Sequence, residues 1–201
     1  YIIAALAATS NISVTIYEVG NTAAISGDAE LAKQLCLEAN INMQEPSIDS
    51  DLSQGVIVDS LLGIGFSGPL RGDFALAIEV INSSFLPVLS IDVPSGLSSD
   101  TGAVEDIAVK ADSTVTFVGA KQGLFTGRGP ALCGEIVYDS LDIPESVLQK
   151  MAPSAQLMDL SELIEYMPEL EADVHKNQRG HCMVIGGDLC FGGAAIMAAE
   201  A

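Results

Sequence analysis

Charged side chains stand just after three apolar stretches of this 201-residue sequence. Asp59 follows "GVIV", Asp92 follows "VLSI", and Lys121 lies just past "TVTFVG". In open parallel sheets, ligands bind outside the carboxyl ends of the strands. If the three stretches are strands of one such sheet, these side chains lie where a ligand binds, and a carboxylate there could bind a substrate or move a proton.

The stretch "DSLLGIGFSGPLRG" contains glycines at a spacing that suits phosphate binding. Gly63, Gly65 and Gly68 satisfy G-x-G-x-x-G, after an apolar run and before a helical pattern. Such a loop can hold phosphates with its backbone N–H groups. It can equally be an ordinary strand-to-helix turn, and Pro69 delays the helix relative to dinucleotide-binding folds. The residues alone leave both interpretations open.

The stretch "IDVPSGLSSDTG" and the lysine after it each allow two interpretations. Pro94 fixes a turn after Asp92, Ser95 offers a hydroxyl and a carbonyl, and Gly96 permits close approach of the backbone. Asp92 is therefore either a functional carboxylate or the start of an Asx turn. Lys121 is either a solvated lysine or a charge that offsets a ligand phosphate. Its neighbours predict a loop outside the core.

The elements that must position these residues alternate between strand and helix patterns. Buried strands are predicted at 13–19, 55–62, 87–93, 113–119 and 135–141. Helices are predicted over 1–10, 28–40, 72–83 and about 144–151, and the second places Leu31, Leu35, Cys36 and Ala39 on one apolar face. The alternation predicts an α/β fold, a Rossmann-like three-layer α/β/α sandwich with a mainly parallel sheet. Residues 119–134, rich in glycine, predict a long loop that is a candidate binding element.

Composition excludes several classes of partner. The net charge is −19, from 27 acidic and 8 basic residues, which argues against nucleic acid and against anionic membrane surfaces. No apolar run reaches the roughly 18 residues needed to span a bilayer. The four cysteines have no disulfide-framework spacing, which favours a reducing, cytoplasmic location. A homo-oligomer is left open.

The chain is expected to hold more than one domain. Residues 1–150 carry the α/β pattern, 151–173 read as a linker, and 174–201 read as the strand, glycine-rich loop and helix that begin a second domain. The first helix lacks an N-cap and the last lacks a C-cap, which suggests a fragment of a longer protein.

Taken together, the motifs resemble a known family. "VDSLLGIGFSG", "PVLSIDVPSGLSSDTGAV", "ADSTVTFVGAKQGLFTGRG" and "GEIVYDSL", in this order, resemble the NAD(P)H-hydrate epimerase domain. The tail "KNQRGHCMVIGGDLCFGGAAIMAAEA" resembles the opening of the ADP-dependent NAD(P)H-hydrate dehydratase, a ribokinase-like domain often fused to it. The resemblance implies a metabolite-repair enzyme that epimerises the R and S hydrates of NAD(P)H, coupled to dehydration of the S form with ADP or ATP.

The resemblance also implies roles for individual residues. It places Asp59 and Ser95 at a potassium site and makes Asp92 a substrate contact, which we expect to handle the proton at C6 of the hydrated ring. Lys121 matches a family lysine, and Ala194 falls at a position that contacts the hydrate in the dehydratase. The cofactor phosphates would lie on the glycine loop, formed by Gly63, Ile64, Gly65, Phe66, Ser67, Gly68 and Pro69.

The match is incomplete, and two other functions stay open. The family's Asn-Asn-Gly-Gly-Asp-Gly loop would precede residue 1, and the nucleotide site of the dehydratase would lie beyond Ala201. This chain by itself is therefore expected to lack part of both sites. A Rossmann-type dinucleotide-binding oxidoreductase and a non-catalytic binding module are the alternatives.

Overall fold

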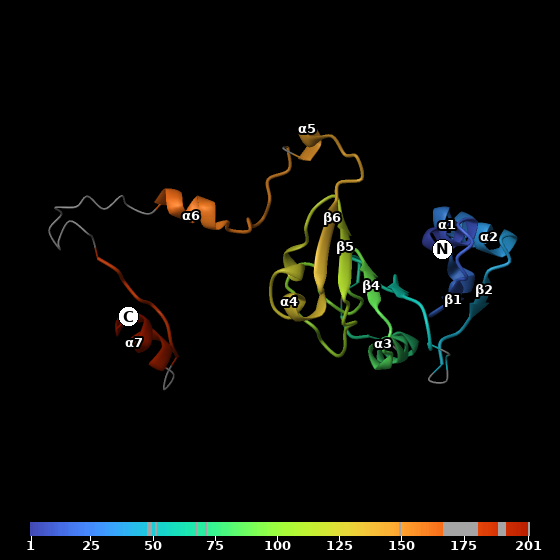
Figure 1. Ribbon diagram of the computed structural model, residues 1–201, viewed down its shortest axis with the longest axis horizontal. Coiled ribbons are helices and arrows are strands. Elements are labelled where there is room, and N and C mark those ends of the chain that lie inside the picture. Colours follow the sequence, from blue (N-terminus) through green and yellow to red (C-terminus); the bar gives the residue numbers. More distant parts are fainter. Residues whose placement is uncertain are drawn as a thin grey trace. The chain divides into compact units, whose positions relative to one another are not determined.

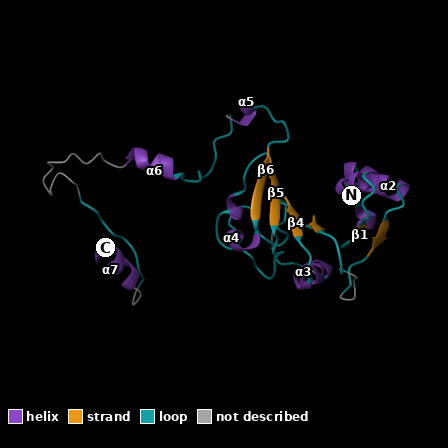
Figure 2. Cartoon of the chain, in the orientation of Figure 1, coloured by secondary structure: helices purple, strands orange, loops and turns teal. Residues whose placement is uncertain are grey.

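The computed structural model describes residues 1–47, 50, 52–66, 68–70, 72–148, 150–166, 181–188 and 192–200. The chain divides into two compact units, Tyr1–Ala152 and Pro153–Ala201. Helices alternate with parallel strands along the first unit, which is the predicted α/β class (Figures 1 and 2). Within the described residues, no helix combines the length and apolar character needed to cross a bilayer.

The strands of the first unit form two parallel sheets. The larger has the order β3-β4-β5-β6, and the smaller pairs β1 with β2. The predicted parallel pairing is confirmed. However, the first predicted strand, β1, belongs to a separate sheet from the other four predicted strands. Its partner β2 comes from a polar stretch for which the sequence predicts no strand. The bounds are β1 (Thr15–Tyr17), β2 (Asn42–Gln44), β3 (Ile57–Asp59), β4 (Val88–Ile91), β5 (Ser113–Phe117) and β6 (Glu135–Asp139).

The predicted helices form, with short 3₁₀ turns between them. In the first unit they are α1 (Ile2–Thr9), η1 (Thr22–Ala24), α2 (Asp28–Glu38), α3 (Asp73–Ser83), η2 (Gln122–Leu124), α4 (Gly129–Leu132) and α5 (Glu145–Leu148). The second unit contributes α6 (Leu160–Tyr166) and α7 (Gly193–Glu200). The strand predicted at the start of the tail is absent from residues 181–188. A strand forms only against a neighbour, and none of the described residues pairs with this segment.

Two clusters of buried side chains hold the larger sheet and its connections together. One joins α3 to β4 and the segment before β5 through Ile78, Val88 and Val109. The other joins the loop after β4 to η2 and α4 through Val93 and Leu124. Both loops that follow β4 and β5 are therefore anchored in the core, and this anchoring fixes the carboxyl edge of the sheet.

The apolar face predicted for α2 is only partly correct. Cys36 is buried, together with Ala32, which lies one turn before it. Leu31 and Leu35 are 66% and 48% exposed. The periodicity identified the helix, but the buried face is set by what packs on it, here α1, and that information is not local.

The segment 119–134 differs from the predicted binding loop. Gln122 is exposed, but Gly123 and Leu124 are buried in η2, so the expectation that the residues after Lys121 lie outside the core holds for Gln122 and is wrong for Gly123. The backbone of this segment interleaves with residues 98–102: Gly123 N donates to the Ser99 carbonyl at 2.7 Å. Glycines permit this approach because a Cβ on Gly102 would overlap the carbonyl oxygen of Thr126.

We expect Gly102→Ala to destabilise the protein by about 2 kcal/mol more than Gly27→Ala. Both glycines have a positive φ, +68° and +66°, so alanine is strained at either site whatever space surrounds it. Only at Gly102 does the added Cβ meet backbone, because nothing lies within 4 Å of it at Gly27. Urea unfolding of both variants measures the difference, and equal losses would show that the two loops separate easily.

Candidate functional site

A buried carboxylate lies at the end of β3, where the sequence predicted one. Asp59 is 1% exposed and pairs in register with Ser90 of the neighbouring strand β4. Its Oδ2 accepts hydrogen bonds from Ser90 Oγ at 2.8 Å and from Ser95 N at 2.9 Å. Its Oδ1 accepts one from Ser95 Oγ at 2.6 Å and one from Leu61 N at 3.3 Å. The structure thus brings together Asp59 and Ser95, which the family resemblance placed at one site.

The charge of Asp59 has no cationic partner in the described part of the chain. No Lys, Arg or His there comes within 4.0 Å of its carboxylate. The donors and acceptors around it are hydroxyl and backbone groups, and Ser95 Oγ also lies 3.4 Å from the Leu62 carbonyl. Oxygen ligands of this kind suit a hard cation, and a cation would compensate a charge that is costly to bury alone. The residues present therefore fit a potassium ion.

Asp92 and Lys121 meet at the ends of β4 and β5. Lys121 Nζ donates to Asp92 Oδ1 in an ion pair and to the Phe117 carbonyl at 2.8 Å. Thr116 Oγ1 at 3.3 Å and Phe117 N at 3.4 Å are further donors to the same carboxylate oxygen. Adjacency of β4 and β5 explains the meeting, because parallel strands end at one edge of the sheet. Lys121 is therefore neither in the core nor a free solvated lysine.

Within its described residues, the glycine loop contains backbone donors without an acceptor. The N–H groups of Gly63, Ile64 and Gly65 find no acceptor among the described residues, whereas Phe66 N donates to the Gly63 carbonyl at 3.1 Å. Nothing described lies within 4 Å of a Cβ built on Gly63, Gly65 or Gly68. An open loop with consecutive free N–H groups is suited to an anion such as a phosphate.

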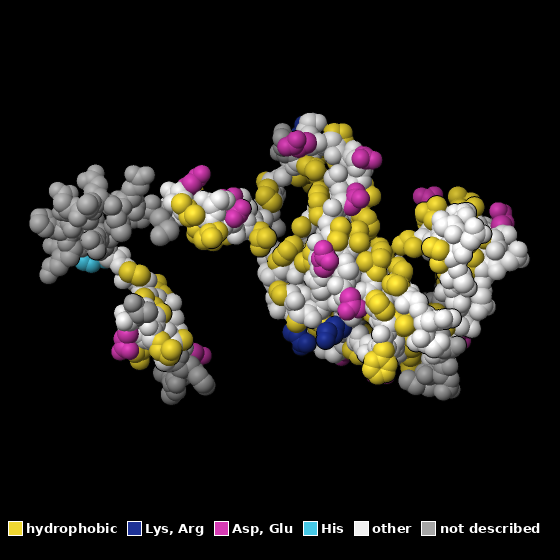
Figure 3. Space-filling model, in the orientation of Figure 1, with side chains coloured by type: hydrophobic (Ala, Val, Ile, Leu, Met, Phe, Trp, Pro, Cys, Tyr) yellow, Lys and Arg dark blue, Asp and Glu magenta, His cyan; other side chains and the backbone are white. Residues whose placement is uncertain are grey.

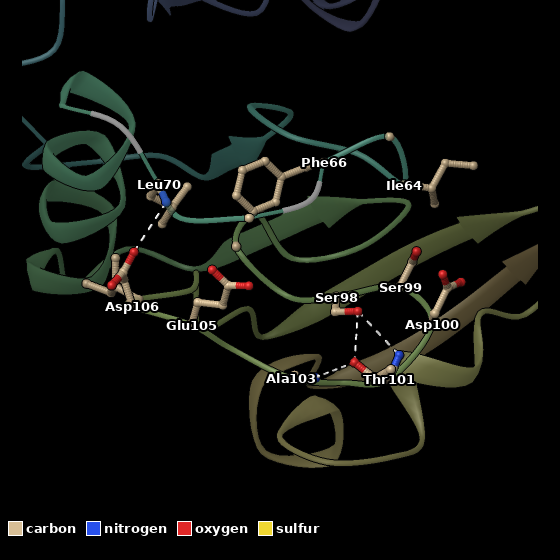
Figure 4. Close-up of a pocket in the computed structure, with 14 residues that line it drawn as sticks. Ile64, Phe66, Leu70, Ser98, Ser99, Asp100, Thr101, Ala103, Glu105 and Asp106 are labelled. Carbon is tan, nitrogen blue, oxygen red and sulfur yellow. Dashed lines mark hydrogen bonds between the residues drawn. The ribbon is translucent and has the colours of Figure 1, made fainter.

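A cleft of about 300 Å³ lies beside this loop. Ile64, Gly65, Phe66 and Gly68 line one side of it, and the chain from Gly96 to Ile107 lines the other. Figure 4 shows the Glu105 and Asp106 side chains extending toward the segment that carries Phe66 and Leu70. Leu70 N donates to Asp106 Oδ2 at 3.2 Å, which ties the end of the glycine loop to the opposite wall.

The cleft is acidic, which the sequence did not predict. No Lys or Arg is among its described lining residues, whereas three carboxylates line it: Asp100, Glu105 and Asp106. Acidic side chains are also scattered over the face drawn in Figure 3, where Lys and Arg occupy small areas. A phosphate in this cleft would meet unfavourable charge unless backbone N–H groups and a bound cation compensate it.

Comparison with known proteins identifies the family. Residues 1–123 match the family model described as YjeF-related protein N-terminus. The chain belongs to this YjeF_N family. The resemblance noted from the strand-end motifs is therefore confirmed.

Named relatives of this YjeF_N chain fall into two groups. The chain is 39% identical over its full length to the bifunctional NAD(P)H-hydrate repair enzyme Nnr of Coxiella burnetii, and 32% identical to that of Escherichia coli K12. It spans 41% and 39% of the length of these proteins. It is also 38% identical over 138 residues to the NAD(P)H-hydrate epimerase of Limosilactobacillus fermentum, a match that covers 67% of this chain and 64% of that protein.

A solved structure supports the fold of the YjeF_N chain. The crystal structure of yeast YNL200c superimposes with a TM-score of 0.52 at 18% identity, over 68% of this chain and 57% of that one. At this identity the likeness concerns the fold alone. It agrees with the flanked parallel sheets described above.

The remaining predicted residues of the YjeF_N chain are only partly placed. Ser67 lies outside the described residues, and Pro69 does not line the cleft. Ala194 is an exposed residue of α7 in the second unit. Sequence reasoning missed Ser90 and Thr116, which hydrogen-bond Asp59 and Asp92. Polar residues within otherwise apolar strands were the signal, because buried hydroxyls in a sheet need partners.

Proposed function

We propose that this chain is the epimerase part of an enzyme that interconverts the R and S hydrates of NADH and NADPH. The observation that carries the proposal is full-length similarity, at 39% identity, to a protein named as a bifunctional NAD(P)H-hydrate repair enzyme. The relative named as an epimerase alone aligns with 67% of the chain. Family membership favours this function over a Rossmann-type oxidoreductase, and the intact Asp59, Ser95 and Asp92 favour it over a non-catalytic module.

The chemistry of the substrate suits a carboxylate at the strand edge. Water added to the enamine of a dihydronicotinamide places the hydroxyl on C6, next to the ring nitrogen. Protonation of that hydroxyl and loss of water leave a cation stabilised by the nitrogen. Water then adds from the opposite face and gives up a proton, which inverts the carbon. Asp92 is the proposed acid–base group for these proton transfers.

The other residues of the edge would hold the substrate. The N–H groups of Gly63, Ile64 and Gly65 are the proposed donors to the cofactor phosphates, within the loop that runs to Pro69. Glu105 and Asp106 make the cleft beside that loop acidic, so binding there depends on compensating positive charge. Lys121 is the last of the proposed substrate-binding residues, and its ammonium is already engaged by Asp92.

Potassium is the proposed compensating ion. Asp59 and Ser95 would hold it, together with the Leu62 carbonyl, because these oxygens surround a buried carboxylate that lacks a cationic partner in the described chain. Bound there, the ion would supply positive charge close to the loop that binds phosphate. No cluster of three or more His, Cys, Asp or Glu side chains in the described residues offers a transition-metal alternative.

The rest of the proposal concerns the whole protein. Residues 1–150 would be the epimerase domain, 151–173 a linker, and 174–201 the start of the dehydratase domain, which would use ADP or ATP and to which Ala194 belongs. A cytoplasmic location fits the unpaired thiols of Cys36, Cys133 and Cys182. Burial raises the pKa of the Cys133 thiol to about 11, so this thiol stays protonated at neutral pH.

A chiral assay tests the proposal on the complete protein. Purified R-NADHX is incubated with the enzyme in potassium or sodium chloride, and formation of the S epimer is followed by chiral chromatography. We expect rapid approach to the equilibrium mixture in potassium and a slower approach in sodium. No acceleration over buffer in either salt would reject the epimerase function, and equal rates in the two salts would reject the potassium site.

A further inference from the structure

The two carboxylate oxygens of Asp92 have different environments. Oδ1 accepts from Lys121 Nζ, Thr116 Oγ1 and Phe117 N. Oδ2 accepts no hydrogen bond from the part of the chain that the structure describes. The side chain is 21% exposed, so one oxygen is held by the protein and the other is open to a ligand.

Lys121 is itself immobilised. Its side chain is 15% exposed, and its ammonium donates to Asp92 Oδ1 and to the Phe117 carbonyl. Holding a lysine in one geometry costs much of its side-chain conformational entropy. A charge fixed in this way is poorly placed to follow a flexible phosphate, but well placed to orient a neighbouring carboxylate.

The backbone on both sides of this pair is strained. Asp92 has φ of +71° at the end of β4, and Val118 has φ of +65° at the end of β5. A β-branched residue in this region is a genuine outlier, and such strain persists only where the surroundings impose it. Val118 N donates to the Asp139 carbonyl at 2.9 Å, and Tyr138 Oη donates to the Val118 carbonyl at 2.7 Å. Strand β6 thus supports the turn that leads to Lys121.

We propose that Lys121 is a positioning residue that fixes the Asp92 carboxyl group, with Oδ1 engaged and Oδ2 presented to the substrate as the oxygen that gives and takes the proton. The inference rests on the proposed epimerase function and gives Lys121 a role other than contact with the substrate phosphates. The lysine keeps its own proton throughout. Its hydrogen bonds to Asp92 Oδ1 and to the Phe117 carbonyl fix the orientation of the carboxyl group.

The test measures R-NADHX epimerisation by the complete protein carrying Lys121→Met. We expect kcat to fall about 100-fold, as for a misplaced catalytic group, with KM changed less than about twofold. In the Asp92→Asn background the same substitution should cause no further loss of kcat. A wild-type kcat, a loss confined to KM, or a full additional loss in that background would each overturn the positioning role.

A conservative variant separates positioning from proton donation. Lys121→Arg keeps the charge and the donors but cannot release a proton near neutral pH. We expect it to recover kcat to within about tenfold of the wild type. A Lys121→Arg enzyme as slow as Lys121→Met would overturn the role. Lys110→Met is the matched control and should leave kcat unchanged. Lys110 is exposed, and its described hydrogen bond, to Asn82 Oδ1, is made by its backbone N–H and not by its side chain.

A second readout does not depend on activity. If the wild-type protein does not epimerise R-NADHX, the proposed function fails, and the Asp92–Lys121 pair is then judged from thermal unfolding. We expect Lys121→Met to lower Tm by less in the Asp92→Asn background than in the wild type, because the lost interaction is shared. Equal shifts in both backgrounds would overturn the pair itself.

Discussion

Asp92→Asn is expected to lower kcat for epimerisation by about 1,000-fold, because one acid–base side chain contributes about 100- to 10,000-fold to such a reaction. The amide cannot accept a proton as the carboxylate does. Asparagine tolerates the left-handed backbone at this position, and its Oδ1 can still accept from Lys121 and Thr116. The measurement is the rate of S epimer formation from R-NADHX, with circular dichroism as the check on the fold.

Asp142→Asn is a matched control for this experiment. Asp142 also has a left-handed backbone, with φ of +57°, and is exposed beyond the end of β6. The same chemical change there should leave both kcat and the circular dichroism spectrum unchanged. Unchanged turnover in Asp92→Asn would show that Asp92 is not the acid–base group.

Asp59→Leu is expected to lower the free energy of unfolding by about 3 kcal/mol. It removes the acceptor for the hydroxyls of Ser90 and Ser95 and for the Ser95 and Leu61 N–H groups. Each buried donor left unsatisfied is destabilising by about 1–3 kcal/mol, and leucine offers only apolar contacts in return. Urea unfolding in potassium chloride is the measurement.

Two further variants make the result specific. Glu79→Gln changes an exposed carboxylate on α3 and should leave the unfolding free energy within about 0.5 kcal/mol of the wild type. Asp59→Asn retains the size of the side chain but loses its charge. If potassium stabilises the wild type more than sodium does, the unfolding free energy of Asp59→Asn should be the same in the two salts. An Asp59→Leu protein as stable as the wild type would show that the surrounding donors find other partners.

The sequence predicted the elements of the sheet better than their arrangement. β-Branched runs identified β3, β4, β5 and β6, and the helical periodicity identified α2 and α3. Strand β2 was missed because Asn42–Gln44 carries no apolar alternation, and it forms by pairing with β1. The buried face of α2 was misjudged because it depends on contacts with α1, far away in the sequence.

For the candidate site, too, the sequence predicted single residues better than the contacts between them. Individual positions at strand ends were predicted, since a parallel sheet collects them at one edge, and the Asp59–Ser95 contact followed from the family resemblance. The pairing of Asp92 with Lys121 was not predicted, because it depends on which strand lies beside β4. The acidity of the cleft was missed too, since Glu105 and Asp106 lie outside every motif.

The close backbone packing of residues 98–102 against the segment 119–134 affects how these two loops move. The amides of Gly123 and Arg128 donate across to the carbonyls of Ser99 and Gly102 in the other loop, although neither amide belongs to a strand or an α-helix. Because no side chain separates the two loops at Gly102 and Gly123, these bonds can break only when the loops part together. In hydrogen exchange, the Gly123 and Arg128 amides should therefore open together, on a timescale shared with the buried Leu124 rather than with exposed turns.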